Sequence, residues 1–245
     1  MAVNVFVHGY MGWGSFDIPY KAVPYWGMFT GDLLKRLRKQ GFACVSASVA
    51  PQGSAWDRAC ELYAQLAGTR TDYGAAHAAR FHHDRFGPDY TGKPLVPQWD
   101  AEHPVTLLGH SFGGPTVRYL AELLVNGHAE EALSASDASP LFRGGQAHLL
   151  PNDGLVNTVA AGAPLEQPKH QLGPADIPTK EPFTGITPAD LTAGIWNVFQ
   201  PYKGDHMSQM GGFFHRNKDV DHYYTELLTL LNELPSKQEK KDTET

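Results

Sequence analysis

The chain has 245 residues, of which 42% are hydrophobic and 19% charged, and this composition is typical of a globular protein rather than a disordered or fibrous one. The formal net charge is −6, and the 20 Lys and Arg residues are scattered, which argues against nucleic acid as a partner. The two cysteines, Cys44 and Cys60, form neither a disulfide framework nor a metal-ligand spacing, so we expect buried thiols.

Neither a leader nor a membrane span is visible in the sequence. Met1 is followed almost at once by a strand-like run, without a basic and then apolar leader, and no apolar run approaches the length of a membrane span. We therefore expect a soluble chain. A secreted protein that has lost its leader would look the same, so the compartment stays open, as does the oligomeric state.

In the first half of the chain, short apolar runs alternate with helical patterns. Strands are predicted at residues 3–7, 42–49 and 105–108, and helices at residues 31–40, 56–67 and 114–126. Alternation of this kind favours an α/β fold with a mostly parallel central sheet and helices on both faces. It also puts functional residues on loops at the carboxyl ends of strands.

The second half contains fewer regular patterns. Residues 133–188 are rich in Gly, Pro, Ser and Asp and are predicted as loop, followed by a last strand at 195–199 and a final helix at 223–234. Because there is no internal repeat and no linker-like composition, we expect one domain over residues 1–234. The charged residues 235–245 are expected to form a flexible tail.

The strongest motif is Gly-His-Ser-Phe-Gly at residues 109–113, between a predicted strand and a predicted helix. A serine with glycines two residues to either side, in this context, is typical of a nucleophile elbow. The glycines permit a strained turn, and the helix amino terminus favours negative charge. Ser111 is therefore predicted to be an exposed nucleophile; a glycine-rich turn of purely structural origin is the alternative.

A second glycine-rich loop, His-Gly-Tyr-Met-Gly-Trp-Gly at residues 8–14, follows the first predicted strand. Such a loop can aim a backbone N–H group at a substrate carbonyl oxygen. We assign that role to Tyr10, with the N–H of Phe112 as the second donor of an oxyanion hole. An ordinary glycine turn remains possible here too.

The acid and the general base are expected downstream of the nucleophile, the acid first in the chain and the histidine after it. The histidines downstream of Ser111 are His128, His148, His170, His206, His215 and His222. His206 follows the predicted strand at 195–199 through a turn, where a general base belongs. For the acid we favour Asp153, because Asp205 is adjacent to His206 and poorly placed to accept from it, although Asn-Asp-Gly at residues 152–154 is also ordinary turn chemistry.

Four aromatic residues follow the glycine-rich loop or belong to it: Trp13, Phe16, Tyr25 and Trp26. They could line an open groove for an acyl or aromatic polyester substrate. They could equally belong to the hydrophobic core, and the sequence does not distinguish the two.

Together these residues resemble the thermoalkalophilic bacterial lipases of Bacillus, Geobacillus and Staphylococcus, with their polyester-hydrolysing anaerobic relatives. The likeness lies in residues 8–14, 56–61, 72–77, 109–113, 139–142, 152–158 and 205–206. It covers the first 165 residues and the last quarter of the chain. The resemblance implies an α/β-hydrolase fold, with the triad on Ser111, Asp153 and His206 and the oxyanion N–H groups on Tyr10 and Phe112.

The resemblance also implies a structural zinc site, with three of its four ligands at Asp57, His77 and His83. Without the resemblance, these residues would indicate a solvent-exposed, histidine-rich helix end. His77 and His83 are six residues apart, about 120° around a regular helix, so both can reach one ion only if the helix is short or broken between them. Water, Asp84 or Asp100 could supply the fourth ligand. The resemblance gives no support for calcium, because Ser208 stands where the calcium site of those lipases needs an acid.

The chain departs from the family in two further ways. Gly109 replaces an alanine common in Bacillus-type members, which is a chemically mild change. A long family segment, which carries the lid and sheet strands, is reduced here to the six residues between Gly145 and Asn152. The loss predicts a reduced fold with an open acyl pocket and esterase-like kinetics without interfacial activation. It also leaves the last strand to pair closer to the elbow strand, or leaves a sheet edge to be covered.

The sequence therefore predicts a carboxylic ester hydrolase, a lipase or carboxylesterase acting through a Ser-His-Asp triad and an acyl-enzyme, with possible activity on polyesters. One alternative is a binding or scaffold protein that kept the hydrolase framework but lost turnover. Another is an amidase or thioesterase using the same triad.

Overall fold

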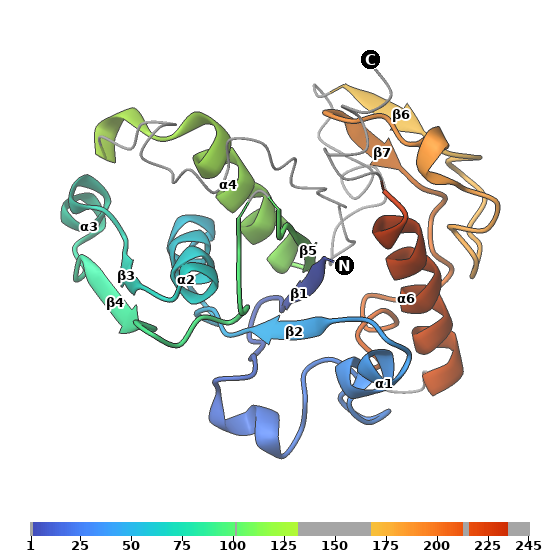
Figure 1. Cartoon of the computed structure of the whole chain (residues 1–245), viewed down its shortest axis with the longest axis horizontal. Coiled ribbons are helices and arrows are strands. Elements are labelled where there is room, and N and C mark those ends of the chain that lie inside the picture. Colours follow the sequence, from blue (N-terminus) through green and yellow to red (C-terminus); the bar gives the residue numbers. More distant parts are fainter. Residues whose placement is uncertain (1, 101, 132–167, 213–215, 235–245) are drawn as a thin grey trace.

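In the computed structural model, which describes residues 2–100, 102–131, 168–212 and 216–234, a small parallel sheet lies at the centre of the fold (Figure 1). Its strands are β1 (Val3–Val7), β2 (Cys44–Ala47) and β5 (Val105–Gly109), in the order β2-β1-β5. Val7 pairs with both Ala47 and Gly109, so the carboxyl ends of the strands lie at one edge. The predicted parallel arrangement is confirmed, and the loops that follow β1 and β5 start side by side.

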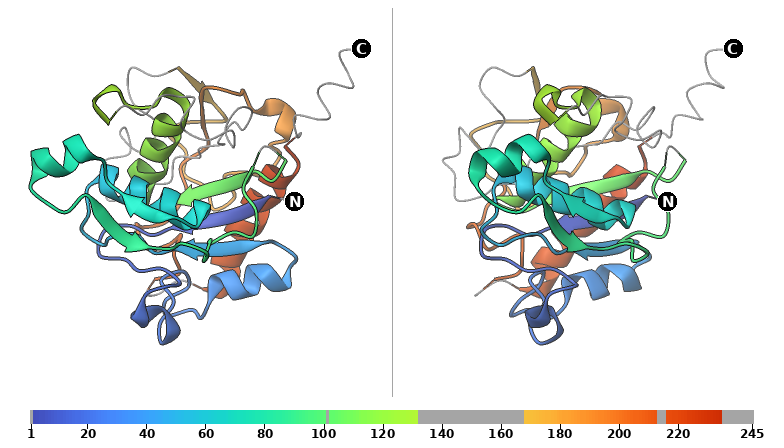
Figure 2. Two further views of the ribbon diagram at one scale, coloured as in Figure 1. Left: turned by 60° about the vertical axis from the view of Figure 1, so that its left-hand side comes forward. Right: turned by 90° about the vertical axis from the view of Figure 1, so that its left-hand side faces the viewer.

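Helices cover both faces of this sheet, as predicted. They are α1 (Leu33–Lys39), α2 (Ala55–Ala67), α4 (Gly113–Asn126) and α6 (Asn217–Asn232). Alternate strand residues point to opposite faces. In β1, Val5 and Val7 pack in one cluster with α2 and α4, whereas Phe6 packs in another with α1 and α6. Figure 2 shows α4 on one side of the strands and α1 on the other.

Local sequence explains where the helices begin and end. The Asp32 side chain accepts the Lys35 N–H at 2.9 Å and so caps the start of α1. Ser54 and Asp57 form a reciprocal capping box at the start of α2, and Gly68 ends that helix in the left-handed conformation. The predicted bounds of α1, α2 and α4 therefore lie within two residues of those observed.

Several short elements were not predicted, because three to seven residues show too little periodicity. They are η1 (Ile18–Lys21), β3 (Arg70–Asp72), α3 (Ala75–Phe81), β4 (Phe86–Asp89), η2 (Ala129–Glu131), β6 (Lys169–Gln171) and η4 (Pro188–Asp190). Strands β3 and β4 form an antiparallel pair beside α2. In its described part, the predicted loop at 133–188 is interrupted by β6, and η4 begins at its last residue.

The last predicted strand is present as β7 (Trp196–Val198), but it pairs with β6 in a separate parallel sheet. Of the two predicted outcomes, pairing of this strand closer to the elbow strand β5 is therefore wrong, and β5 is left at one edge of the described central sheet. The reason is local: β6 lies in polar sequence read as loop and supplies a partner nearer in the chain. Helix α6 begins at Asn217, six residues earlier than predicted. Residues 132–167 and the predicted tail at 235–245 lie outside the described residues.

The two cysteines expected to be buried and the four aromatic residues considered for a groove or the core differ in their exposure. Cys44 is buried as expected, whereas Cys60 is only partly buried. Tyr25 and Trp26 belong to the core, with 5% and 0% exposure, while Phe16 is exposed. Two of the four aromatic residues considered for a substrate groove are therefore core residues. None of the described helices is long and apolar enough to cross a membrane.

Replacing Leu228 with alanine tests how firmly α6 holds the sheet. Leu228 is fully buried in the cluster that contains Phe6, so Leu228→Ala should lower the free energy of unfolding by about 2–5 kcal/mol. Thr229→Ala, at the neighbouring exposed position, should change it by no more than about 0.5 kcal/mol. Urea denaturation measures both, and equal effects would contradict the assigned packing.

Candidate active site

The turn between β5 and α4 has the geometry of a nucleophile elbow. Ser111 has a φ of +56°, a region that non-glycine residues rarely adopt. A Cβ on Gly113 would lie 2.2 Å from the carbonyl oxygen of Val7, so only glycine fits where α4 begins against β1. The strained backbone lifts the half-buried Ser111 above the carboxyl edge of the sheet.

Gly109 is equally constrained, which corrects the expectation that alanine is a mild change here. A Cβ on Gly109 would lie 2.4 Å from the carbonyl carbon and oxygen of Gly113. Because those atoms are backbone, they cannot move without disturbing the turn. In this chain a side chain at Gly109 would meet the backbone of Gly113, and one at Gly113 would meet the backbone of Val7, so both positions require glycine.

The loop after β1 lies directly beside Ser111. A Cβ on Gly9 would be 2.6 Å from the Ser111 Cβ and 3.1 Å from its Oγ. Two hydrogen bonds hold the peptide that joins His8 to Gly9. The carbonyl of His8 accepts Arg58 Nη2 at 2.5 Å, and the Gly9 N–H donates to the Tyr25 hydroxyl at 3.1 Å.

The next peptide joins Gly9 to Tyr10. Its carbonyl oxygen accepts His8 Nδ1 at 2.9 Å and the Gly12 N–H at 3.2 Å. Since N–H and C=O of a trans peptide point in opposite directions, these two bonds also orient the Tyr10 N–H. Among the described residues, neither this N–H nor that of Phe112 has an acceptor. The chain therefore presents two unused donors on the two loops that meet at Ser111.

Arg58 ties these loops together and was missed as a functional residue. It is fully buried on α2, and donates through Nε to Thr116 on α4 at 2.9 Å and through Nη1 to the carbonyl of Ala50 at 2.6 Å, besides its bond to His8. Burial lowers the pKa of Arg58 to about 10, so it stays charged at neutral pH. Its helical spacing with Leu62 and Leu66, both buried, was the available signal.

His206 lies on the loop after β7, beside the elbow. Its ring centroid is 4.7 Å from that of His110, and its carbonyl oxygen accepts His110 Nε2 at 2.8 Å. The Nδ1 of His206 is buried without a hydrogen-bond partner among the described residues. No hydrogen bond between the described residues joins Ser111 to the His206 ring. The structure thus brings the predicted base to the residue next to the nucleophile.

The predicted acid, Asp153, lies outside the described residues. The neighbouring candidate Asp205 accepts the Met207 N–H at 2.9 Å and the Ser208 hydroxyl at 3.2 Å. These bonds close the turn that carries His206. The Asp205 carboxylate is therefore hydrogen-bonded within its own turn, in agreement with the expectation that it is poorly placed to accept from His206.

A second cluster of polar side chains brings together Asp57, His77 and His83, whose potential ligand atoms all lie within 4.8 Å of one another. His77 Nε2 is 3.0 Å and His83 Nε2 is 3.7 Å from Asp57 Oδ1. Helix α3 ends at Phe81, and His82 adopts the left-handed conformation with a φ of +58°. This break in the helix is the one that the six-residue spacing of the two histidines required.

The surroundings of the cluster suit a metal ion. His83 Nδ1 lies 2.8 Å from the carbonyl oxygen of Asp84, so this nitrogen is the donor and Nε2 keeps a free lone pair. Trp56 stacks on the His77 ring at 5.0 Å. Asp84 and Asp100, considered as fourth ligands, are not part of the cluster, and the Asp100 carboxylate is 2.7 Å from His103 Nδ1.

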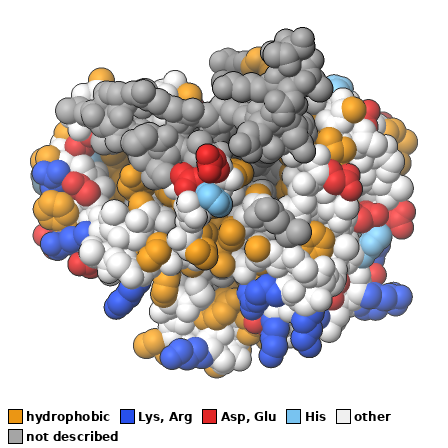
Figure 3. Space-filling model, in the orientation of Figure 1, with side chains coloured by type: hydrophobic (Ala, Val, Ile, Leu, Met, Phe, Trp, Pro, Cys, Tyr) orange, Lys and Arg blue, Asp and Glu red, His pale blue; other side chains and the backbone are white. Residues whose placement is uncertain are grey.

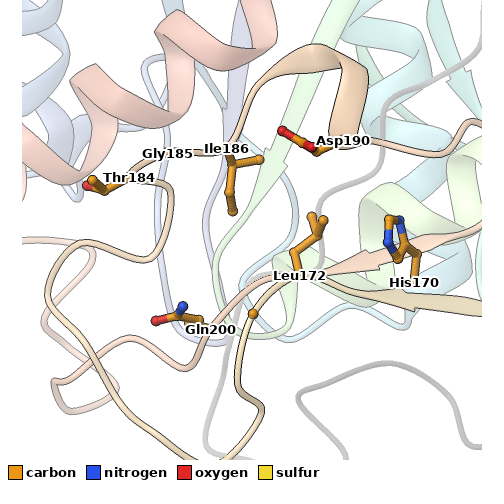
Figure 4. Close-up of a pocket in the computed structure, with 8 residues that line it drawn as sticks. His170, Leu172, Thr184, Gly185, Ile186, Asp190 and Gln200 are labelled. Carbon is orange, nitrogen blue, oxygen red and sulfur yellow. The ribbon is translucent and has the colours of Figure 1, made fainter.

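A shallow cavity of about 330 Å³ lies in the part of the fold that contains β6 and β7. His170, Leu172, Ile186, Asp190 and Gln200 are among the residues that line it (Figure 4). It contains none of the residues predicted from the sequence to act in catalysis or metal binding. Its mixture of exposed polar and apolar groups suggests no particular chemistry.

Comparison with known proteins connects this site to lipases. Residues 2–164 match the family model described as Lipase-like, C-terminal domain. Lipase 2 of Staphylococcus aureus is 43% identical over 150 residues, which are 60% of this chain and 21% of that protein. Lipase 1 of Staphylococcus aureus (strain Mu50 / ATCC 700699) is 38% identical over 159 residues, which are 63% of this chain and 22% of that protein.

Two solved structures also match. EstA from Clostridium botulinum gives a TM-score of 0.51 at 41% identity, covering 59% of this chain and 33% of that one. Staphylococcus hyicus lipase gives a TM-score of 0.51 at 39% identity, covering 59% of this chain and 38% of that one. The chain thus spans about a fifth of the curated relatives that it matches. The predicted resemblance to Staphylococcus-type lipases is confirmed.

Gly109→Ala tests the crowding of the elbow. Because the added methyl group would meet the backbone of Gly113, the variant should lose about 1–3 kcal/mol of unfolding free energy. Chemical denaturation measures the loss, with Thr229→Ala as the control on an exposed helix position. A fully stable Gly109→Ala protein would mean that the turn relaxes and that glycine is not required.

Proposed function

Because the chain belongs to the family described as Lipase-like, C-terminal domain, we propose that it is a serine ester hydrolase, a lipase or carboxylesterase of α/β-hydrolase type. The observation that carries the proposal is the strained Ser111, held at φ +56° between a parallel strand and a helix amino terminus. A left-handed serine costs folding free energy, and such strain is concentrated at functional sites.

In the proposed reaction, Ser111 Oγ attacks the ester carbonyl carbon while His206 accepts the hydroxyl proton. The tetrahedral intermediate collapses to an acyl-enzyme, and the histidine passes its proton to the departing alcohol. Water then attacks the acyl-enzyme, again losing a proton to His206. The acid is released and the Ser111 hydroxyl is restored.

The oxyanion of each intermediate would be held by the N–H groups of Tyr10 and Phe112. Support comes from three features: both groups lack acceptors among the described residues, Gly9 touches Ser111, and the Gly9–Tyr10 peptide is fixed by two bonds to its carbonyl oxygen. Donors that are already oriented stabilise developing charge without reorganising.

The acid of the proposed triad is Asp153. The support is indirect: the buried Nδ1 of His206 lacks a partner among the described residues, and this is the nitrogen that a triad carboxylate holds. A buried donor without an acceptor is costly, so a partner for it is expected. Asp153 has the chain position that the family order requires, between nucleophile and histidine.

The substrate is proposed to be an apolar ester. Tyr10, Met11, Phe16 and Ile18 expose large side chains on the loop beside the proposed oxyanion donor, Ile18 at 88%. Figure 3, drawn in the orientation of Figure 1, shows hydrophobic side chains in the lower part of the view, where the segment after β1 lies. We propose esterase-like kinetics without lid gating, and activity on polyesters as an extension. An amidase, a thioesterase or an inactive scaffold remains an alternative to be tested with matched substrates.

Ser111→Ala should abolish hydrolysis of p-nitrophenyl butyrate while leaving the thermal unfolding of the protein nearly unchanged, because only one partly exposed hydroxyl is lost. A fluorophosphonate probe should label the wild type at Ser111 and leave the variant unlabelled. An ester series from C2 to C16, with and without an oil surface, checks chain length and lid gating. Turnover by the variant would refute the mechanism, and a folded wild type without labelling would favour the scaffold.

We further propose that Asp57, His77 and His83 hold a structural zinc ion, as the resemblance implies. A carboxylate and two imidazoles are suitable zinc ligands, with the fourth position left to water or to another group. A bound ion would join α2 to α3 and to the segment that follows α3, and so stabilise the fold without taking part in the reaction.

Elemental analysis should find about one zinc per wild-type chain and well below one in the double variant Asp57→Asn, His77→Ala, because two of three ligands are lost. Chelation should lower the melting temperature of the wild type only. His103→Ala, a histidine outside the cluster, is the control and should retain the metal. Wild-type protein without zinc after gentle purification would exclude the site.

A further inference from the structure

A buried chain of hydrogen bonds runs behind the proposed active site, from the loop after β1 to the loop that carries His206. The Gly9 N–H lies 3.1 Å from the Tyr25 hydroxyl, which lies 2.7 Å from His110 Nδ1. His110 Nε2 lies 2.8 Å from the His206 carbonyl oxygen. We propose that Tyr25 and His110 are positioning residues that hold the oxyanion loop and the base in fixed relation; this inference rests on the proposed function.

The chemistry of the end groups fixes the direction of every bond in this chain. A carbonyl oxygen only accepts, so His110 Nε2 carries a proton and donates it to His206. A neutral imidazole has one N–H, which leaves Nδ1 as an acceptor. The Tyr25 hydroxyl therefore donates to Nδ1, and its oxygen accepts the Gly9 N–H. All three donors point the same way, from Gly9 towards His206.

Burial protects this arrangement from water. His110 is 1% exposed and Tyr25 is 5% exposed. Burial lowers the pKa of His110 to about 4 and raises that of Tyr25 to about 12, so both are neutral over the ordinary pH range. The Tyr25 ring packs edge-on against Trp13 and Trp26, which fixes the hydroxyl between its two partners. The bonds therefore keep one pattern rather than exchanging with solvent.

The hydrogen-bond chain meets the groups with proposed roles at three points. Gly9 precedes Tyr10, the proposed oxyanion donor. At the other end, the bonded carbonyl belongs to His206 itself, and His110 precedes Ser111. One tyrosine and one histidine thus connect the donor loop, the nucleophile turn and the base loop. Without the Tyr25 hydroxyl, the Gly9 N–H loses its acceptor and His110 Nδ1 loses its donor, so the loop after β1 is no longer tied to His110 and His206.

Tyr25→Phe removes the hydroxyl and keeps the ring that packs in the core. We expect kcat for p-nitrophenyl butyrate to fall by about 10- to 100-fold, less than the ~10²–10³-fold loss that follows removal of an oxyanion donor itself. KM should change little, because no substrate contact is lost. Tyr63→Phe removes a hydroxyl from a partly buried tyrosine packed against Trp99, away from the elbow, and should leave both constants unchanged.

The tautomer of His110 gives a readout that does not depend on turnover. In protein labelled with ¹⁵N-histidine, the His110 signals are identified as those missing from His110→Gln. They should report the Nε2–H tautomer in all three proteins, with the Nδ1 signal of Tyr25→Phe shifted from its position in the wild type and in Tyr63→Phe, because only there does Nδ1 lose its hydrogen bond. A wild-type Nδ1–H tautomer, or a Tyr25→Phe variant with wild-type kcat, would overturn the proposal.

Failure of the proposed function would look different. In that case the wild type would not react with the fluorophosphonate probe, whatever the state of His110. If the wild type is labelled and the Nδ1 signal follows the hydroxyl but kcat does not, the bonds exist and the positioning role is refuted. A fall in kcat together with the shift of the Nδ1 signal supports it.

Discussion

The site depends on one close approach, between the carboxyl end of β1 and the first turn of α4. Val7 pairs with Gly109 in the sheet, and its carbonyl oxygen lies where a side chain on Gly113 would be. This contact leaves room for glycine alone where α4 begins, and the chain passes from β5 to α4 through one left-handed residue. Ser111 takes that conformation, and the loop after β1 is brought against it by the same strand pairing.

The polar groups around this contact are buried but almost all paired, which is what makes the loops rigid. A charged arginine on α2 satisfies carbonyl groups of two loops and a hydroxyl on α4, and burial strengthens these bonds. Within the described residues, the N–H groups of Tyr10 and Phe112 are exceptions. This pattern among the described residues supports the proposed oxyanion hole.

Features of the fold and site could be predicted from the sequence where a short run of consecutive residues determines them. The parallel sheet, the covering helices and Ser111 follow from short runs such as Val3–Val7 and Gly109–Gly113, whose patterns span only a few consecutive residues. The histidine pair at 77 and 83 needed family likeness, because the break at His82 leaves no periodic signal. The partner of β7 and the bond from Tyr25 to His110, 85 residues away, depend on tertiary contacts that no local pattern encodes.

The placement of His206 is a physical problem of its own. The strand that precedes it, β7, pairs with β6 and not with the central sheet, so sheet pairing does not carry the base to the nucleophile. Two other anchors remain. Met210 and α6 pack in the core cluster that contains Phe6, and His110 holds the carbonyl of His206. Since His110, the residue before the proposed nucleophile, also binds the carbonyl of His206, the elbow itself helps to locate the proposed base, which lies beyond residues 2–164 that match the family.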